Sequence, residues 1–342
     1  MAYTQPSPGD VHVNRPLTNM SIAFMQGADG FVASRAFPRI PVMNQSNSYY
    51  VYPIETFFRS EMEERAPGDP PVISTHKLSH DTYDCRVWAE ATPVTDEERA
   101  NVDRVIRLDR AATRRLTASG MIRFEKRWTD LAFKDGTWAF REDGVNSGET
   151  AAGSFSPRDF GNNQVKKWNA TGVDPILRID EAKDRMREWT GKEPNTLVLG
   201  STTYRVLRHH DEVIGRLNAG QTPGGPAMAN RQRLAELLEI PNIMVMKAIR
   251  ETTNEGVTDS SRSFIGPQSD ALLMYSAEAP GMEEASAGYT FAWQGFLGME
   301  EEGMRIRRYR KSDRLSDFVA IDMAWDFKVT SDVLGYHFND IV

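Results

Sequence analysis

The chain has 342 residues, of which 40% are hydrophobic and 26% charged, an ordinary composition for a globular protein of one large or two medium domains. No apolar run approaches the roughly 18 residues of a membrane span, and "MAYTQPSPGD" lacks the order of a signal peptide, so we expect a soluble chain without an export signal. The formal net charge of -7 argues against a chain that seeks nucleic acid as a whole.

The first 20 residues contain three prolines and many polar side chains, which predicts an extended arm. Two strand-like segments follow, "SYYVYPIETFF" and "KLSHDTYDCRVWAEA", and the polar segment 60–71 between them is far longer than a tight hairpin needs. Residues 48–59 at roughly 3.3 Å each make an arm of about 40 Å, whereas a compact chain of this length has a radius of gyration of about 20 Å. The hairpin therefore folds back or leaves its own domain.

The single cysteine, Cys85, excludes an internal disulfide and fits a reducing compartment. Because Cys85 alternates with Tyr83 and Val87 in the second strand-like segment, we interpret it as a packed side chain rather than a nucleophile.

A helical pattern occupies residues 96–133, with Thr95 as a cap and Glu97 and Glu98 in the first turn. The apolar stripe restarts after Gly120, which predicts a bend there. Arginines lie outside the stripe, so either water or another molecule faces them; they are Arg104, Arg107, Arg110, Arg114 and Arg115. The following segment predicts a short hairpin at "KDGTW", with Trp138 and Phe140 buried.

Residues 174–246 alternate helices with short strands, which is typical of an α/β layer. Asp174 is a predicted N-cap, with Pro175 at the first helical position and Gly191 beyond the last turn. The strand "TLVLG", a helix capped by Ser201, the helix "RLAELLEI" and the strand "IMVM" follow. The first helix has one apolar stripe, formed by Ile176, Ile179, Ala182, Met186 and Trp189.

Near the C-terminus, "DFVAIDMAWDFKV" has an apolar residue at every second position, which predicts a strand with one buried and one wet face. The basic segment "MRIRRYRKSD" before it also alternates, so ion pairing within or between chains is favoured over phosphate binding. The whole chain is predicted to be α+β with a projecting hairpin.

Motifs for catalysis, cofactors or metals are weak. One cysteine and six scattered histidines do not supply a zinc set, and we interpret His209 and His210 as residues at a helix end. Walker A and GxGxxG motifs are absent, and Ser286 in "EASAG" lacks the first glycine of a nucleophile elbow. "GQTPGGPAMAN" is interpreted as a mobile loop rather than a phosphate cradle. We therefore expect no enzyme activity, catalytic residue, cofactor or metal.

Several segments, in their order, resemble the major capsid proteins of tailed bacteriophages, which share the Hong Kong 97 capsid fold with encapsulin shells. They are "NTLVLGSTTYRVLRHHDEV", "RLAELLEIPNIMVMKA", "SAGYTFAW" and "DFVAIDMAWDFKVTSDVLGYHF". The resemblance extends from about residue 19 onward. It implies a protein that self-assembles into an icosahedral head shell enclosing viral DNA.

The resemblance also implies the domain organisation. It gives an N-terminal arm (1–44), an extended loop (45–92), a peripheral domain with a long spine helix (93–168, completed by 299–330), an α/β axial domain (169–298) and a C-terminal segment (331–342). The extended loop would reach over a neighbouring subunit, and charge would dock its tip. The predicted interface residues are Glu61, Met62, Glu63, Glu64, Arg104 and Arg107.

The expected partners are copies of the chain itself in pentamers and hexamers, a portal, a decoration protein, and packaged DNA through weak non-specific contact. No membrane partner is expected. Only about 20 polar residues precede the first apolar run, whereas some family members carry a long helical prodomain, so scaffolding should come from a separate chain. The expected location is the virion capsid, assembled in the host cytoplasm.

Two alternatives remain open at the level of sequence. An encapsulin-type nanocompartment would share the fold, and a soluble α/β enzyme would have its site in the axial segment. Some relatives join a loop lysine to an asparagine of another subunit. Lys77 and Asn339 are the only such pair that we nominate, and we expect no crosslink between them.

Overall fold

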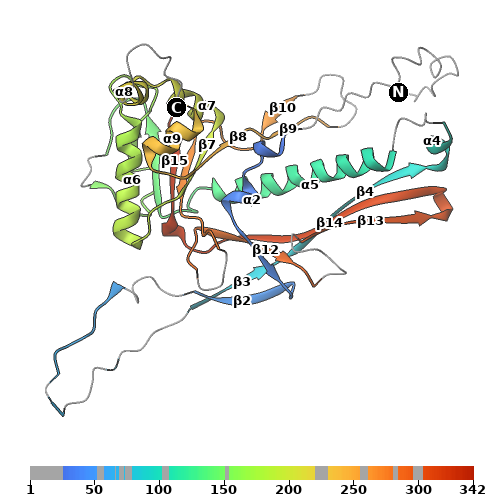
Figure 1. Cartoon of the computed structure of the whole chain (residues 1–342), viewed down its shortest axis with the longest axis horizontal. Helices are drawn as coiled ribbons and strands as arrows, with labels where there is room; N and C mark the ends of the chain where they lie inside the picture. The colour runs from blue at the N-terminus through green and yellow to red at the C-terminus, as the bar shows by residue number, and fades with distance from the viewer. Residues whose placement is uncertain are drawn as a thin grey trace.

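The computed structural model describes residues 26–51, 58–65, 67–68, 73, 79–101, 108–150, 154–219, 230–254, 261–279, 284–295 and 303–342. It is α+β, as predicted, and elongated: a helix-covered sheet forms one end, a long sheet with helix α5 extends from it, and a hairpin projects away from both (Figure 1). No helix in these ranges is long and apolar enough to cross a membrane.

The end rich in helices, here called the axial part, is built on a six-stranded sheet in the order β6-β5-β15-β11-β7-β8. β7 pairs in parallel with β8, and β5 pairs in parallel with both β6 and β15. β11 lies between these two groups and is antiparallel to its neighbours β15 and β7. The strands are β5 (Phe140–Val145), β6 (Gln164–Lys166), β7 (Thr196–Gly200), β8 (Asn242–Met246), β11 (Ala271–Met274) and β15 (Gly335–Asn339). Strand pairing thus places β5 and β6 in this sheet, although they precede the boundary at 168 expected from the sequence.

Both faces of the axial sheet are covered, which explains why "TLVLG" is a continuous apolar run. Leu197 and Leu199 of β7 pack in a core with the helices of the axial part, whereas Val198 packs in a second core with α5. The helices are α6 (Pro175–Thr190), α7 (Ser201–His209), α8 (Asp211–Ala219) and α9 (Arg231–Leu238).

Helix α6 has the predicted ends. The Asp174 side chain accepts hydrogen bonds from the backbone N–H groups of Ile176 and Leu177, and Gly191 adopts a φ of 63°. Two details differ from prediction. Trp189 is 51% exposed because it lies at the end of the buried stripe, and Ser201 is the first residue of α7 after the cap position, which Gly200 occupies.

The long sheet, here called the spine sheet, has the order β1-β12-β14-β13, and β4 pairs with β14 along its other edge. These strands are β1 (Arg39–Val42), β4 (Arg86–Thr95), β12 (Gly288–Trp293), β13 (Met304–Lys311) and β14 (Ser316–Val329). The 3-10 turn η3 (Ser312–Arg314) joins β13 to β14, and η4 (Asp332–Leu334) precedes β15.

The prediction that β14 has one solvent-exposed face is wrong. Val319, Ile321 and the other alternate residues pack under α5 as expected, but Asp322 and Ala324 on the opposite face are also buried, at 2% and 0% exposure. The reason is that β14 is hydrogen-bonded on both edges, so the side chains of β4 and β13 enclose the short side chains between them.

Helix α5 (Leu108–Ala132) runs without interruption through Gly120, where the sequence predicts a bend. Gly120 allows close packing instead, because a Cβ atom at this position would lie 2.7 Å from the sulfur of Met323 on β14. A separate short helix, α4 (Asp96–Asn101), precedes α5, and residues 102–107 lie outside the described ranges.

The predicted hairpin at "KDGTW" is also wrong. The chain turns after α5 and enters β5, whose partners β6 and β15 are both parallel to it. Trp138 and Phe140 are buried as predicted, with exposures of 2% and 0%. The Trp138 indole N–H donates to the Ala132 carbonyl at 2.6 Å, which ties the turn to the end of α5.

The N-terminal segment joins the core from Phe31 onward. It contains η1 (Ala28–Gly30), α2 (Ala33–Ala36) and β1, which pairs in parallel with β12. The Phe37 ring meets Trp128 and Trp138 edge-on at centroid distances of 6.0 and 6.5 Å. A two-stranded sheet of β9 (Ile249–Glu251) and β10 (Arg262–Phe264) lies near α2 (Figure 1).

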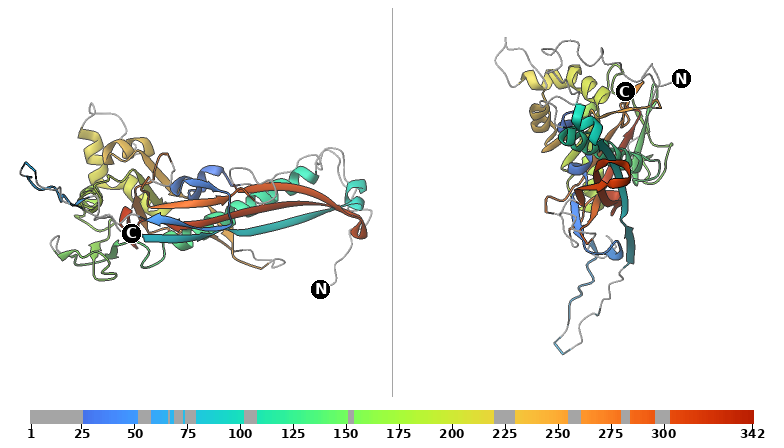
Figure 2. Two further views of the ribbon diagram at one scale, coloured as in Figure 1. Left: turned by 90° about the horizontal axis from the view of Figure 1, so that it is seen from below. Right: turned by 90° about the vertical axis from the view of Figure 1, so that its right-hand side faces the viewer.

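The projecting hairpin consists of β2 (Ser46–Val51) and β3 (Ser79–Asp84), paired antiparallel over six residues each. Residues 52–57 lie outside the described ranges, and residues 59–65 form no regular strand. The hairpin and α5 lie on opposite sides of the spine sheet, as two perpendicular views show (Figures 1 and 2).

Candidate subunit interface

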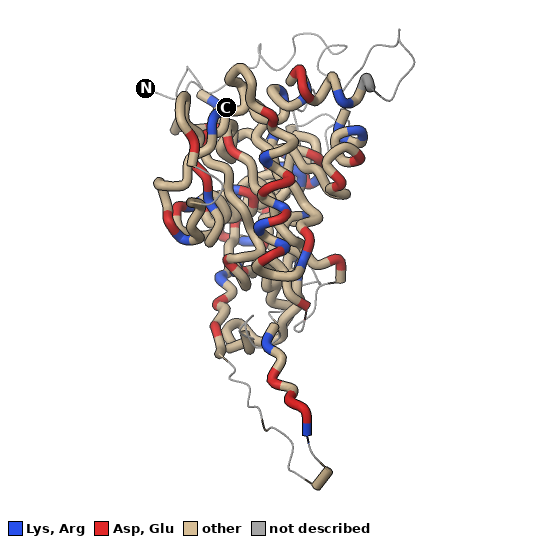
Figure 3. The backbone as a smooth tube through the Cα atoms, turned by 90° about the vertical axis from the view of Figure 1, so that its left-hand side faces the viewer, with Lys and Arg blue, Asp and Glu red and all other residues tan. Residues whose placement is uncertain are grey.

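The hairpin with its described extension, residues 46–51, 58–65 and 79–84, is here called the arm. Glu61, Met62, Glu63 and Glu64 are all exposed on it, and Met62 reaches 93% exposure. Acidic residues gather along the outer part of the arm (Figure 3). An exposed methionine between carboxylates has no partner within the described part of its own chain, so this segment has the character of a contact surface.

The arm touches its own chain near the C-terminal end of α6. A Cβ atom at Gly191 would lie 3.2 Å from the Phe58 ring, so this ring lies directly against the glycine backbone. Phe58 is nevertheless 61% exposed. The arm therefore passes the axial part and continues beyond it, which answers the question of whether the hairpin folds back onto its own core.

The spine sheet presents a second exposed surface that the sequence analysis missed. On β4, every second side chain faces away from α5 and is exposed, and these four residues define the outer sheet surface: Val87, Ala89, Ala91 and Pro93. The alternation in "RVWAEATPV" could have indicated this surface, but small side chains at every second position are also typical of a strand whose outer face meets only solvent. A row of short apolar side chains leaves room for an extended chain to lie close to the sheet.

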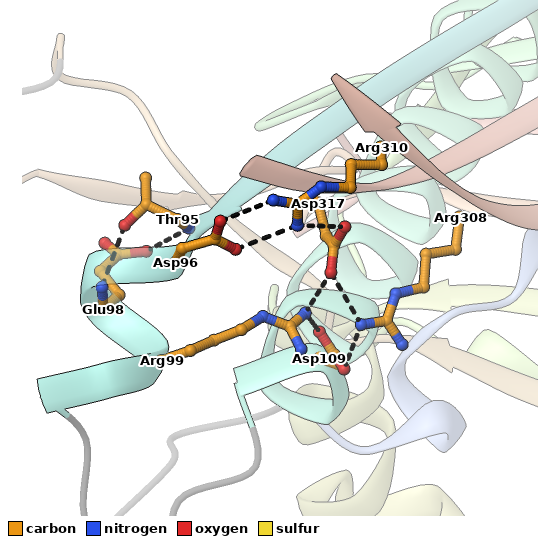
Figure 4. Close-up of polar contacts among 8 residues, drawn as sticks. All are labelled: Thr95, Asp96, Glu98, Arg99, Asp109, Arg308, Arg310 and Asp317. Carbon is orange, nitrogen blue, oxygen red and sulfur yellow. Dashed lines mark hydrogen bonds and ion pairs between the residues drawn. The ribbon is translucent and has the colours of Figure 1, made fainter. Parts of the chain in front are cut away.

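The far end of the spine sheet is held by a network of ion pairs (Figure 4). Arg99 of α4 contacts Asp109 at 2.6 Å and Asp317 at 3.1 Å, and Arg308 of β13 contacts the same two carboxylates at 3.0 and 3.3 Å. Two arginines thus share two aspartates, which joins both helices to the end of the sheet.

Arg310 extends this network to the start of α4. It contacts Asp96 at 2.6 Å and Asp317 at 3.4 Å, and its hydrogen bond lowers the pKa of the Asp96 carboxyl. Thr95 and Glu98 form a capping box, in which each side chain accepts from the other residue's backbone N–H at 3.0 to 3.1 Å. The predicted capping role of Thr95 is confirmed.

The basic segment of β13 is occupied by contacts inside the chain. Arg305 and Arg307 both reach the buried Asp322, at 2.9 and 2.8 Å, while Arg308 and Arg310 belong to the network at the sheet end. Ion pairing, favoured from the sequence over phosphate binding, is therefore what the structure shows, and it lies within one chain.

Arg104 and Arg107, the predicted partners of the arm, lie outside the described residues, so their contact with the arm stays a prediction. Their neighbours in sequence are α4, which ends at Asn101, and α5, which begins at Leu108; both helix ends adjoin the ion-pair network.

The residues considered in the sequence as nucleophiles, Cys85 and Ser286, are buried and bonded to backbone groups. Cys85 is fully buried, its thiol donates to the Phe291 carbonyl at 3.4 Å, and burial raises its pKa to about 12, so the predicted packing role is confirmed. The Ser286 hydroxyl is 1% exposed and bonded to backbone groups. Among the described residues, no three His, Cys, Asp or Glu side chains form a group that could hold a metal ion.

Asn339 donates its amide to Asp143 at 2.6 Å in the axial sheet, whereas Lys77 lies outside the described ranges. Because this amide is already bonded, we expect no covalent join between subunits. Assembled particles that are boiled and reduced should run as single chains on a denaturing gel. A ladder of multimers would contradict this prediction.

No family model matches the sequence. Among curated proteins, the chain is 24% identical over 252 residues to the major capsid protein of Burkholderia phage BcepMu, covering 72% of this chain and 73% of that protein. It is 23% identical over 330 residues to the major capsid protein of Pseudomonas phage JBD67, covering 96% and 97%.

Solved structures agree in fold. A phage-related protein of Bordetella bronchiseptica superposes with a TM-score of 0.66 at 18% identity, covering 92% of this chain and 93% of that one. The capsid of cyanophage P-SCSP1u superposes with a TM-score of 0.59 at 10% identity, covering 98% and 95%. The projecting arm, long helix, spine sheet and α/β axial part, together with these matches, show that the chain has the Hong Kong 97 capsid fold and that its sequence is similar to those of phage major capsid proteins.

Proposed function

We propose that the chain assembles through its arm into pentamers and hexamers that close as an icosahedral head around packaged viral DNA. The observation that carries this proposal is the arm itself. It bears Phe58 and Met62 at 61% and 93% exposure, and it projects beyond the cores of its own chain. Exposing this apolar area to water is unfavourable, so burying it against another copy of the chain would lower the free energy.

The outer sheet surface of a neighbouring copy is the proposed seat of the arm. Its four exposed residues are small and apolar, and the arm supplies larger apolar side chains at Phe58 and Met62. Glu61, Glu63 and Glu64 would then reach Arg104 and Arg107 of the neighbour. Each exposed ion pair contributes only about 0 to 1 kcal/mol, but a ring repeats the contact in every subunit.

Further partners belong to the same proposal. A separate chain serves as scaffold. A portal, a decoration protein and weakly held DNA complete the partner set. Assembly takes place in the host cytoplasm, and the chain performs no catalysis.

The experiment that tests this function is negative-stain imaging and native mass measurement of the purified chain. We expect rings or closed particles, because the fold presents the arm for contact with another copy. A soluble enzyme would instead remain a small oligomer, and that result would contradict the proposal. A cargo enzyme that copurifies with particles lacking phage DNA would favour an encapsulin-type compartment.

A further inference from the structure

Helix α5 has one buried and one exposed side over its N-terminal half. Ala112 and Leu116 face the spine sheet and are 6% and 1% exposed. Arg110 and Arg114 are exposed on the opposite side and Arg115 is exposed on the flank, and these three residues are here called the α5 basic surface. Helix α2 covers α5 only farther along, where it meets Glu125.

The α5 basic surface differs from Arg99, Arg308 and Arg310, at the same end of the molecule, in having no carboxylate partner among the described residues. Arg99, Arg308 and Arg310 each contact at least two aspartates within 3.4 Å. By contrast, Arg110, Arg114 and Arg115 form no hydrogen bond or ion pair with any residue that the structure describes.

The acids of α5 do not neutralise this surface. Asp109 is held by Arg99 and Arg308, Asp130 by Lys126 at 2.5 Å, and Glu125 is buried beneath α2. The α5 basic surface therefore carries three positive charges on a chain whose net charge is -7.

The spacing of these arginines suits a row of phosphates. Arg110 and Arg114 are four residues apart, a rise of about 6 Å along the helix, and a guanidinium forms bidentate hydrogen bonds with phosphate oxygens. A long, exposed helix side with neither a deep pocket nor an aromatic platform fits the backbone of a polymer rather than a base.

The position of the α5 basic surface separates it from the proposed seat of the arm. The outer sheet surface and the α5 basic surface lie on opposite sides of the spine sheet, and the arm projects on the side away from α5 (Figures 1 and 2). In a shell one subunit thick, contact of the arm with the outer sheet surface leaves α5 on the other surface of the shell.

We propose that the α5 basic surface faces the lumen and binds the phosphate backbone of packaged nucleic acid, without sequence preference. This inference rests on the proposed function, because only a closed shell gives the surface a lumen to face. Three phosphate contacts per subunit are few, so the binding is weak for one subunit and acts through many copies around the shell.

The test compares duplex DNA binding by free subunits at a series of salt concentrations, using fluorescence anisotropy of a labelled duplex of mixed sequence. Arg110, Arg114 and Arg115 are changed together to glutamine. We expect the slope of log affinity against log salt to fall in magnitude by about 2.7, which corresponds to about 0.9 for each lost phosphate contact. Because these side chains are exposed, the variant should keep the thermal midpoint of the wild type.

The matched control removes three other arginines from the axial helices by the changes Arg205→Gln, Arg208→Gln and Arg231→Gln. Its net charge equals that of the first variant, so an effect of overall charge would appear in both. We expect the control to keep most of the wild-type slope. Equal slopes for the two variants, or no change in either, would overturn the proposal.

Two further readouts fix the side of the shell and the kind of partner. Closed wild-type shells should leave added long duplex DNA unbound, whereas free subunits bind it; shells that bind it through these arginines would place the surface outside. The α5 variant should still form closed shells. If it fails to assemble, the arginines serve a protein contact and the nucleic-acid proposal is wrong, while wild-type assembly would still support the proposed function.

Discussion

Changing Glu61, Glu63 and Glu64 together to lysine should leave the free subunit folded but block or strongly slow shell assembly. The subunit should fold because all three side chains are exposed on an arm that has no core of its own. Assembly should fail because the arm would then bring three positive charges toward the arginines proposed as its partners. The contact is repeated in every subunit of a ring, so a modest loss for each copy removes the assembled state.

The measurement is particle yield by negative stain and sedimentation at low and high salt, with circular dichroism to confirm folding. A second variant that also carries Arg104→Glu and Arg107→Glu should partly restore assembly, since the charges are exchanged between partners. The matched control is Glu188→Lys on the exposed side of α6, which should assemble normally. Normal particles from the triple variant at both salt concentrations would rule out docking by charge and leave Phe58 and Met62 as the anchors.

The stability of the subunit should fall as the pH rises from about 5 to 8, and Glu125 should account for a large part of the decrease. Its carboxylate is 2% exposed and accepts backbone N–H groups of Val32 and Ala33 at 2.9 to 3.0 Å, which holds α2 against α5. Burial is the largest influence and raises the pKa of Glu125 to about 7, although these hydrogen bonds and the nearby Arg35 oppose the shift.

The free energy of unfolding falls with rising pH because of proton linkage. The folded state binds the Glu125 proton more tightly than the unfolded chain does, so the stabilisation is full below the ordinary glutamate pKa of 4.5 and is lost as the pH passes 7. Between pH 5.5 and 8 this group alone should lower the free energy of unfolding by about 2 kcal/mol.

Urea unfolding of free subunits at these two pH values measures the effect. The variant Glu125→Gln does not ionise, so its free energy of unfolding should change less with pH than that of the wild type. Its absolute stability is a poorer guide, because an amide group offers one acceptor where the carboxylate offers two. Glu188→Gln is the control and should retain the wild-type pH dependence. An unchanged pH dependence in the Glu125 variant would contradict the assignment.

Local signals in the sequence determined the elements whose ends and faces are set by their own residues. The caps of α6 at Asp174 and Gly191, the capping box of Thr95 and Glu98, and the strands around "TLVLG" and "IMVM" all formed as predicted. Such signals act within a turn or a strand, where backbone geometry and a few side-chain hydrogen bonds decide the outcome. The exposed residues of the arm were recognisable for the same reason.

Only the tertiary structure decided what depends on neighbours distant in sequence. Gly120 is a breaker in an isolated helix, yet Met323, about 200 residues away, needs the space that it leaves. The alternation in the sequence places Asp322 on an exposed face of β14. In the structure, β4 and β13 enclose this side chain and two arginines neutralise its charge. Pairing of β13 with β14 also gives the arginines of β13 carboxylate partners within the chain, and this distinguishes them from the arginines of the α5 basic surface. Burial and charge neutralisation arise from contacts between segments far apart in the chain, and local periodicity does not encode them.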